Sequence, residues 1–569
     1  MSKLESLVSW AKDHGALIHQ DVSFEQTELG VSAIYKGSGQ YDNSSNLFQI
    51  PQSITLTPTL AEEIFGSDLI PKGNRNALTQ LLLAKLRFDP QESKTDSINL
   101  SSHFKPYLDI LPEGHDTLSP LFWSDVERNT IKGTDAHLAI DYKISQLVDE
   151  WYSIVSKIDS KFQPKTFQED ISFYKGFTKG KSEQFWKYLN LPQSWTSFPA
   201  YLWASAIFNS RAFPFLLAGN EICRDLNEAF LVPIFDLLNH DNEANVKWDS
   251  LDSSNGKNFI FKTEQKLKNG DEIYNSYGPK TNQELMFGYG FAIENNKEDR
   301  ATLALRIPEA NIESANTFGL KLTTNEVSYP ITKENPLPTP LIDLFAYLVK
   351  SDEETKITLR NRLEGLQQLQ KIIQQKIDLL KNLKNEGVEN AQIIKIAKIY
   401  KNSQKVFYQL TFEEITKQEK SLLKKYKPLS FKSIYKQDKT FANSLLLIFG
   451  ITDYEQLAKS DDVDRALLLW IIRVGNKPHY TTDKQSLPDW IHKKYQTIAS
   501  KLSVSREDVI EYKDIYKALF PALETKIPEV YGKGDWSIKS FITAGKVIAD
   551  ISFTRSSNNE IFLIEKIEL

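Results

Sequence analysis

The spacing of apolar residues divides the first part of the chain into two segments of different character. In LFQIPQSITLT (residues 47–57) apolar and polar residues alternate, as on a strand with one buried face. From 58 to 189 helical spacing replaces this alternation, for example at Leu78, Leu81, Leu82 and Leu86. The pattern predicts a small β unit followed by a helical block.

A helix followed by short strands is predicted between 194 and 296. Leu202, Trp203, Ala206 and Ile207 have helical spacing, and the segments NFIFK (258–262) and DEIYNSY (271–277) are typical of strands. Asn269-Gly270 lies between these two segments, and both residues tolerate positive φ. We therefore expect the two segments to pair as a β-hairpin.

Beyond about residue 306 the pattern becomes helical again. Apolar residues follow 3,4,4,3 spacing at Leu366, Leu369, Ile373, Ile377 and Leu380. One face of a long helix is therefore apolar and needs partner helices to cover it. The carboxyl-terminal third is predicted to form a helical domain.

Composition narrows the class of protein. A chain of 569 residues with 41% apolar residues exceeds the size of one hydrophobic core, so we expect two or three domains. Cys223 is the only cysteine, which excludes a disulfide framework and a thiolate zinc cluster. The chain shows neither a signal peptide nor a membrane-spanning run. We expect a monomer in the cytoplasm, with the nucleus as a further location.

Charge is balanced overall but not locally. Lysine and arginine (69) nearly balance aspartate and glutamate (74), so no global field attracts nucleic acid or a membrane. Residues 391 to 440, however, contain twelve lysines and four acidic residues. This stretch is either a solvated helix face or a docking surface for ribosomal RNA or an acidic protein.

Two polar segments carry the candidate chemistry. In LVPIFDLLNHDNEANVKWD (231–249) an apolar run ends in Asp236, followed by Asn239 and His240. Buried polar groups at such a point need partners. Farther along, Tyr277 and Tyr289 each precede a glycine, which lets backbone approach closely.

These segments, with SRAF (210–213) and FKPYLDILP (104–112), resemble the SET-domain protein-lysine methyltransferases. The similar branch contains the Rubisco large-subunit methyltransferase and the fungal ribosomal lysine methyltransferases. LIDLFAYL (341–348), RLEGLQQL (362–369) and ISFTRSS (551–557) extend the resemblance over nearly the whole chain. It implies an α+β fold: a β-rich SET fold with a pseudoknot (1–57 and 191–305), a helical insertion (58–190) and an all-helical substrate-binding domain (306–569).

The resemblance also implies roles for single residues. Tyr277 matches the catalytic tyrosine at the transferred methyl, and Tyr289 matches a residue of the lysine channel. The cofactor, S-adenosylmethionine, would contact Asn239, His240, and the turn at Leu29 and Gly30. In this turn Glu28 stands where the family has a first glycine. Arg211 and Asp236 match positions bordering the cofactor and lysine pocket, and a purely structural ion pair is the alternative.

The implied activity is methylation of a protein lysine, most specifically in a large-subunit ribosomal protein. It requires no metal. Two alternatives stay open from the sequence: a histidine methyltransferase of the same fold, and a catalytically silent protein that binds ribosomes or RNA. Retention of Tyr277, Asn239 and His240 argues against the silent alternative.

Overall fold

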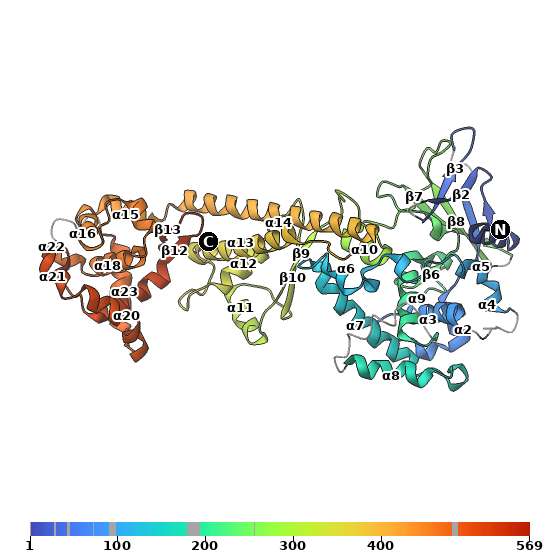
Figure 1. Ribbon diagram of the computed structural model, residues 1–569, viewed down its shortest axis with the longest axis horizontal. Helices are drawn as coiled ribbons and strands as arrows, with labels where there is room; N and C mark the ends of the chain where they lie inside the picture. Colours follow the sequence, from blue (N-terminus) through green and yellow to red (C-terminus); the bar gives the residue numbers. More distant parts are fainter. Residues whose placement is uncertain are drawn as a thin grey trace. The chain divides into compact units, whose positions relative to one another are not determined.

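The computed structural model describes residues 2–27, 30–41, 46–71, 73–89, 91, 98–178, 194–254, 256–480 and 487–569. The chain forms two compact units (Figure 1), which are described separately. The first comprises Met1–Arg300 and Leu380–Gln404, and the second Ala301–Leu379 and Lys405–Leu569. The division into four segments expected from the sequence stays a prediction, because the two units have different boundaries from those segments.

Small antiparallel sheets form the β part of the first unit. The main sheet has the order β1-β4-β8-β7, with Phe48 of β4 opposite Phe261 of β8. The strand predicted within 47–57 is confirmed for Phe48–Pro51, whereas Gln52–Ile54 form a 3-10 helix. Two further pairs are β2 with β3 and β5 with β6. The strands are β1 (Leu17–Ile18), β2 (Val22–Thr27), β3 (Gly30–Tyr35), β4 (Phe48–Pro51), β5 (Ala212–Pro214), β6 (Ala229–Leu231), β7 (Val246–Ser253) and β8 (Gly256–Thr263).

Helices make up most of the rest of the first unit and confirm the predicted helical block as far as residue 178; residues 179–193 lie outside the described residues. They are α1 (Lys3–Asp13), α2 (Pro58–Phe65), α3 (Ala77–Phe88), α4 (Leu100–His103), α5 (Lys105–Leu108), α6 (Asp125–Asn129), α7 (Asp135–Val155), α8 (Phe167–Thr178), α9 (Phe198–Arg211) and α10 (Asn282–Tyr289).

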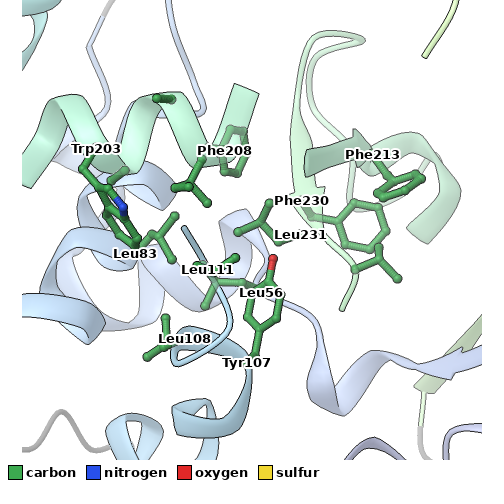
Figure 2. Close-up of a cluster of buried hydrophobic side chains, with 14 of the residues drawn as sticks. Leu56, Leu83, Tyr107, Leu108, Leu111, Trp203, Phe208, Phe213, Phe230 and Leu231 are labelled. Carbon is green, nitrogen blue, oxygen red and sulfur yellow. The ribbon is translucent and has the colours of Figure 1, made fainter. Parts of the chain in front are cut away.

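One hydrophobic core joins the helical block to the strands (Figure 2). Leu83 of α3 and Trp203 of α9 lie on one side of this close-up, and Phe213 and Phe230 of the β5–β6 pair lie on the other. Tyr107 of α5 is buried between them. Burial of these large side chains ties α5 to the strands that carry the candidate site.

The predicted hairpin between NFIFK and DEIYNSY is wrong. NFIFK lies in β8, but both edges of β8 are already occupied by β4 and β7. Residues 270–273 instead bond to β3: the N–H of Gly270 donates to the carbonyl of Tyr35 (2.8 Å), and that of Ile273 donates to Ala33 (2.8 Å). Gly270 still has the positive φ of a turn, +91°.

Leu380–Gln404 completes the first unit from a distant part of the sequence. Ile396, Ala397 and Tyr400 belong to its hydrophobic core. Ser403 donates a hydrogen bond to the carboxylate of Asp299, and the Gln404 side chain donates to the carbonyl of Arg300 (3.2 Å). The first unit therefore depends on side chains that follow Arg300 by about a hundred positions.

The second unit is helical, as predicted, but it is not all-helical. Its helices are α11 (Ile312–Phe318), α12 (Thr339–Leu348), most of α13 (Leu359–Asn382), the later part of α14 (Ala391–Tyr426), α15 (Phe431–Gln437), α16 (Lys439–Phe449), α17 (Tyr454–Lys459), α18 (Val463–Gly475), α19 (Asp489–Lys501), α20 (Arg506–Leu519), α21 (Ala522–Lys526), α22 (Pro528–Tyr531) and α23 (Ile538–Ile551).

Two small sheets interrupt these helices. One pairs β9 (Ala301–Arg306) with β10 (Glu326–Ile331), and the other has the order β11-β13-β12 (Leu429–Ser430, Glu560–Leu563 and Ser552–Arg555). In β9 the even alternation of buried and more exposed residues suits a strand with one covered face. The apolar stripe of α13 is buried at Leu366, Leu369, Ile373, Ile377 and Leu380, which confirms the 3,4,4,3 prediction.

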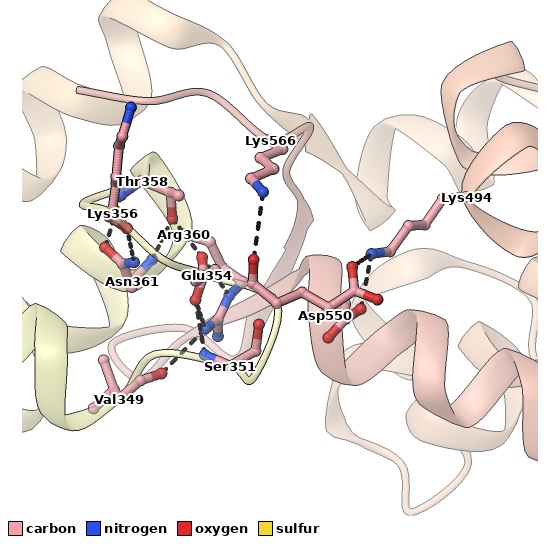
Figure 3. A network of polar contacts seen from close by, with 11 residues as sticks. Val349, Ser351, Glu354, Lys356, Thr358, Arg360, Asn361, Lys494, Asp550 and Lys566 are labelled. Carbon is pink, nitrogen blue, oxygen red and sulfur yellow. Dashed lines mark hydrogen bonds and ion pairs between the residues drawn. The ribbon is translucent and has the colours of Figure 1, made fainter. Parts of the chain in front are cut away.

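A closed polar network precedes α13 in the second unit (Figure 3). The carboxylate of Glu354 accepts hydrogen bonds from Arg360, Thr358 and the backbone N–H of Ser351. Both ions of the Glu354–Arg360 pair are almost completely buried.

Nowhere in the described part of the chain does a helix combine the length and the apolar character needed to span a membrane.

Candidate active site

The two polar segments singled out in the sequence lie side by side in the first unit. The N–H of Asn275 donates to the carbonyl of Asn239 (2.7 Å), and the N–H of Asp241 donates to the carbonyl of Asn275 (3.0 Å). His240 and Asn275 form a parallel bridge. We call this contact of residues 239–241 with Asn275 the crossing. Just upstream, buried Ile234 has a φ of +76°, which is rare for a β-branched residue. Asp236 follows this strained turn by two residues and Asn239 by five.

His240 is held in one tautomer at this crossing. Its Nδ1 accepts the N–H of Tyr277 (3.0 Å), so the proton lies on Nε2, which donates to Oδ1 of Asn242 (2.8 Å). Burial lowers the pKa of His240, which keeps the ring neutral near pH 7. Its ring stacks on that of Tyr277 at 4.9 Å.

The Asn239 side chain connects the crossing to the start of β3. Its Nδ2 donates to the carbonyl of Val31 (3.2 Å) and to Oε1 of Glu272 (2.8 Å). Gly30, directly before Val31, has a φ of +106°, and apart from its chain neighbours no heavy atom of the described residues lies within 4 Å of the position a Cβ would take. Leu29 and Glu28 lie outside the described residues. The carbonyl of Gly30 accepts a hydrogen bond from the Thr27 hydroxyl (3.1 Å).

Tyr277 and Tyr289 stack on each other. Their ring centroids are 4.4 Å apart with an interplanar angle of 18°. The Tyr277 hydroxyl donates to the carbonyl of Leu238 (2.9 Å), which leaves its oxygen free to accept a contact. Burial raises the pKa of Tyr277 far above its usual value, and that of Tyr289 to about 12. Both hydroxyls are protonated near pH 7.

The position of Tyr289 is set by the end of α10. Gly290, which caps this helix, has a φ of +73°. A Cβ at this position would lie 1.8 Å from the carbonyl oxygen of Thr117, so only glycine fits. The cap thus packs α10 directly against the loop before α6, with Tyr289 as its last helical residue.

Arg211 and Asp236 form an ion pair beside the two tyrosines. Arg211 donates to the carbonyl of Asp236 (2.8 Å) and lies 3.4 Å from its Oδ2. The Tyr107 hydroxyl donates to the same Oδ2 (2.7 Å). Oδ1 of Asp236 is buried without a hydrogen-bond partner among the described residues. Burial raises the pKa of Asp236, although the Arg211 charge acts in the opposite direction.

A cavity of about 610 Å³ joins these groups. Four of the sequence-predicted residues line it: Arg211, Asp236, Tyr277 and Tyr289. Asn239, His240 and Gly30 instead group at the crossing, which reaches the cavity through Tyr277. The remaining lining residues are Ser210, Ala212, Phe213, Pro214, Val246, Lys247, Trp248, Asn275, Ser276, Gly278 and Lys280.

Sequence reasoning did not name three residues that shape this cavity. Phe213 and Trp248 meet edge to face at 5.1 Å, and Nε1 of Trp248 donates to Oδ1 of Asn275 (3.1 Å). Tyr107 reaches the cavity only through Asp236. Phe213 and Tyr107 lie in the SRAF and FKPYLDILP segments, so these motifs were the available signal. Trp248 had none.

Comparison with known proteins identifies the family. Residues 300–426 match the family model described as the EFM1 middle domain. The chain is 35% identical to the protein-lysine N-methyltransferase EFM1 of Saccharomyces cerevisiae, over 99% of this chain and 98% of that protein. The chain belongs to the EFM1 family of protein-lysine N-methyltransferases.

Two further proteins are similar to this member of the EFM1 family. It is 29% identical to ribosomal lysine N-methyltransferase 1 of Saccharomyces cerevisiae, over 99% of both chains. The SET domain of LSMT bound to lysine and AdoHcy aligns with a TM-score of 0.54 at 17% identity, covering 79% of this chain and 99% of that one. The predicted SET fold is thereby confirmed, and the chain is a protein-lysine N-methyltransferase.

Proposed function

We propose that this enzyme methylates a lysine of a large-subunit ribosomal protein, with Tyr277 as its catalytic residue. One observation carries the assignment of the site: the stacked Tyr277 and Tyr289 and the Arg211–Asp236 pair border a single cavity beside the Asn239–His240 crossing. The relative named ribosomal lysine N-methyltransferase 1 supports the choice of substrate. We expect the reaction in the cytoplasm, with the nucleus as the alternative location.

The methyl donor is S-adenosylmethionine, and the crossing fits it. No side chain of the described residues fills the space beside Gly30, so the cofactor could approach the backbone there. Asn239 would hold the cofactor beside β3 and His240 would hold it beside Tyr277, since their side chains link these elements. When bound, the cofactor supplies a methyl group on a positively charged sulfur.

Tyr277 and Tyr289 would align the target amine. In-line displacement requires the amine nitrogen, methyl carbon and sulfur to be collinear, so positioning is the main catalytic task. The Tyr277 hydroxyl donates to Leu238, and its oxygen can accept a weak contact from the polarised methyl. Because burial raises its pKa, Tyr277 keeps its proton and does not act as a base.

The cavity would also favour the reactive form of the lysine. A free lysine has a pKa of about 10.4, so its amine is protonated in water at pH 7. Aromatic walls such as Tyr289, Trp248 and Phe213 exclude water and disfavour the charged form. The amine would lose its proton to solvent before it is aligned.

Transfer of radiolabelled methyl from S-adenosylmethionine to ribosomal proteins tests the proposal. The proteins come from a strain lacking this enzyme, and mass spectrometry locates the label. We expect labelling of one ribosomal-protein lysine by the wild type and a loss of about 100-fold or more with Tyr277→Phe, about 3 kcal/mol at the transition state. Tyr142→Phe, on an exposed tyrosine of α7, is the matched control and should leave labelling unchanged.

Two outcomes would overturn the proposal. If the wild type labels no ribosomal protein but labels another protein of a whole extract from the same strain, the substrate is refuted and the enzyme stands. Equal labelling by wild type and Tyr277→Phe would refute the assignment of the catalytic residue.

A further inference from the structure

The later part of α14 carries a line of exposed lysines in the second unit. Lys417, Lys420 and Lys424 follow i, i+3, i+7 spacing, which places them on one face of the helix. Lys425 and Lys427 extend the line past the helix end, and all five side chains are exposed. We call these five residues the lysine stripe. At about 1.5 Å rise per residue, it is about 15 Å long.

The acidic residues of the same region do not neutralise the stripe. Residues 415–440 contain eight lysines but only Glu419 and Asp438 as acids. Glu419 is paired with Arg555 (2.6 Å), and Asp438 is paired with Arg473 (3.0 Å). Both acids are buried. No acid between 415 and 440 therefore offers an exposed carboxylate to the stripe, although Lys432, which lies outside the stripe, pairs with Glu455 (2.6 Å).

Within the stripe, only Lys417 has a carboxylate partner among the described residues. It pairs with Glu414 at 3.1 Å. A cation near a helix carboxyl end interacts favourably with the helix dipole, which accounts for Lys424 and Lys425 in the last turn. This effect fades within one turn, so it does not account for Lys420 or for the line as a whole.

The chemistry of the stripe favours RNA over protein or lipid. Protein interfaces are depleted in lysine and built around apolar anchors. Membrane-binding helices insert apolar side chains. The apolar residues beside the stripe, Leu422, Leu423 and Tyr426, instead pack inward on the cluster around Leu359 and Phe553. Nucleic-acid interfaces are polar and strongly positive, and lysines bind phosphates as point charges.

We propose that the lysine stripe binds the phosphate backbone of RNA without regard to sequence. The choice of RNA rests on the proposed ribosomal substrate, since a ribosomal protein lies beside RNA. The stripe would increase the local concentration of enzyme at such a target without taking part in methyl transfer. Four lysines of the stripe have no carboxylate partner among the described residues, so we expect about four phosphate contacts.

The test measures binding of the full chain to a short fluorescent single-stranded RNA as salt is varied, without S-adenosylmethionine. For about four phosphate contacts, the logarithm of the binding constant should fall with the logarithm of salt at a slope of about −3. In Lys420→Gln/Lys424→Gln the slope should become shallower by about 1.4, and affinity at low salt should fall at least about tenfold.

Lys157→Gln/Lys165→Gln is the matched control, because it removes two exposed lysines of the first unit with the same change in net charge. It should bind RNA as the wild type does. Equal binding by the two double variants, or no binding by the wild type at low salt, would overturn the proposal. So would tighter binding to a highly acidic polypeptide than to RNA.

A methylation assay separates this proposal from the proposed function. Lys420→Gln/Lys424→Gln should methylate an isolated protein substrate at the wild-type rate, because the stripe lies outside the cavity. If RNA binding is present but no ribosomal protein is methylated, the proposed substrate is wrong and the stripe stands. If methylation is present without RNA binding, only the stripe is refuted.

Discussion

Each unit contains an ion pair between an arginine and a buried aspartate carboxylate, and the two pairs are built differently. In the second unit Arg473 donates from Nε to Oδ2 of Asp438 (3.0 Å) and from a terminal nitrogen to Oδ1 (3.2 Å), so both carboxylate oxygens are occupied. In the first unit Asp236 receives Arg211 and Tyr107 on Oδ2 alone.

The difference lies in what each pair leaves unsatisfied. Oδ1 of Asp236 has no partner among the described residues, its carboxylate borders the cavity, and burial raises its pKa. Asp438 lies in a closed arrangement within a hydrophobic core. A buried carboxylate with both oxygens bonded to its partner supports folding, whereas one with a free oxygen keeps binding capacity at a cost in stability. The two pairs should therefore respond differently to substitution.

Asp438→Ala should give the largest effect, on stability. Removing one partner leaves the Arg473 charge buried and uncompensated, which costs about 3–5 kcal/mol. Chemical denaturation should show this loss in the second unit. Methyl transfer per folded molecule should stay within about twofold of wild type. A similar loss with Asp438→Leu/Arg473→Leu would show that the charge imbalance is not the cause.

Asp236→Asn should give the opposite result, a loss of activity larger than the loss of stability. The amide keeps the shape but loses the charge that faces Arg211, which is worth about 1.5–3 kcal/mol. We expect kcat/KM for methyl transfer to fall by about 10- to 100-fold. An equal fall in stability, measured by denaturation, would make the pair structural, like Asp438–Arg473.

Glu354→Gln extends the comparison to a third ion pair, the buried pair Glu354–Arg360, whose contribution to stability should depend on pH. Burial alone would raise the pKa of Glu354, but hydrogen bonds from Arg360, Thr358 and Ser351 outweigh it and lower the pKa below 4.5. A carboxyl with a lowered pKa stabilises the fold above its unfolded pKa and loses this contribution as pH falls through the folded value. The variant should be less stable by about 2 kcal/mol at pH 7.

The stability difference between wild type and Glu354→Gln should shrink below about pH 4.5. Denaturation curves at several pH values measure it. A difference independent of pH would mean that packing, and not the charge of Glu354, stabilises the network of Figure 3.

Tyr107→Phe should give the smallest effect. It removes one hydrogen bond to Asp236 while Arg211 stays in place, at about 1 kcal/mol. We expect kcat/KM to fall about fivefold, mainly through KM, as the carboxylate loses its fixed orientation. Tyr201→Phe also removes a buried hydroxyl, here bonded to Glu150 away from the cavity, and should leave KM unchanged.

Local patterns in the sequence predicted much of the secondary structure. The buried stripe of α13 and the alternation of β4 follow directly from residue spacing. The failed hairpin shows the limit of such patterns. Asn269-Gly270 does turn the chain, but which strand receives the following segment depends on the edges of β8, which distant strands occupy.

The site was predictable as a set of residues but not as a network. Resemblance pointed to Tyr277 and Tyr289, and the structure adds that their rings stack. The resemblance could not reveal the hydrogen bond between Tyr107 and Asp236, which joins residues 129 positions apart. Which side chains bond over such distances in the sequence depends on how the whole unit packs. The spacing of apolar residues does not contain this information.

The return of Leu380–Gln404 to the first unit has a consequence for synthesis of the protein. A ribosome releases the chain from its amino end, so every strand around Tyr277 emerges well before Ser403, which bonds Asp299. The catalytic unit is thus assembled only after more than two thirds of the chain has been translated. A fragment ending at Arg300 should expose the apolar surface that Ile396, Ala397 and Tyr400 cover, and should aggregate or be degraded.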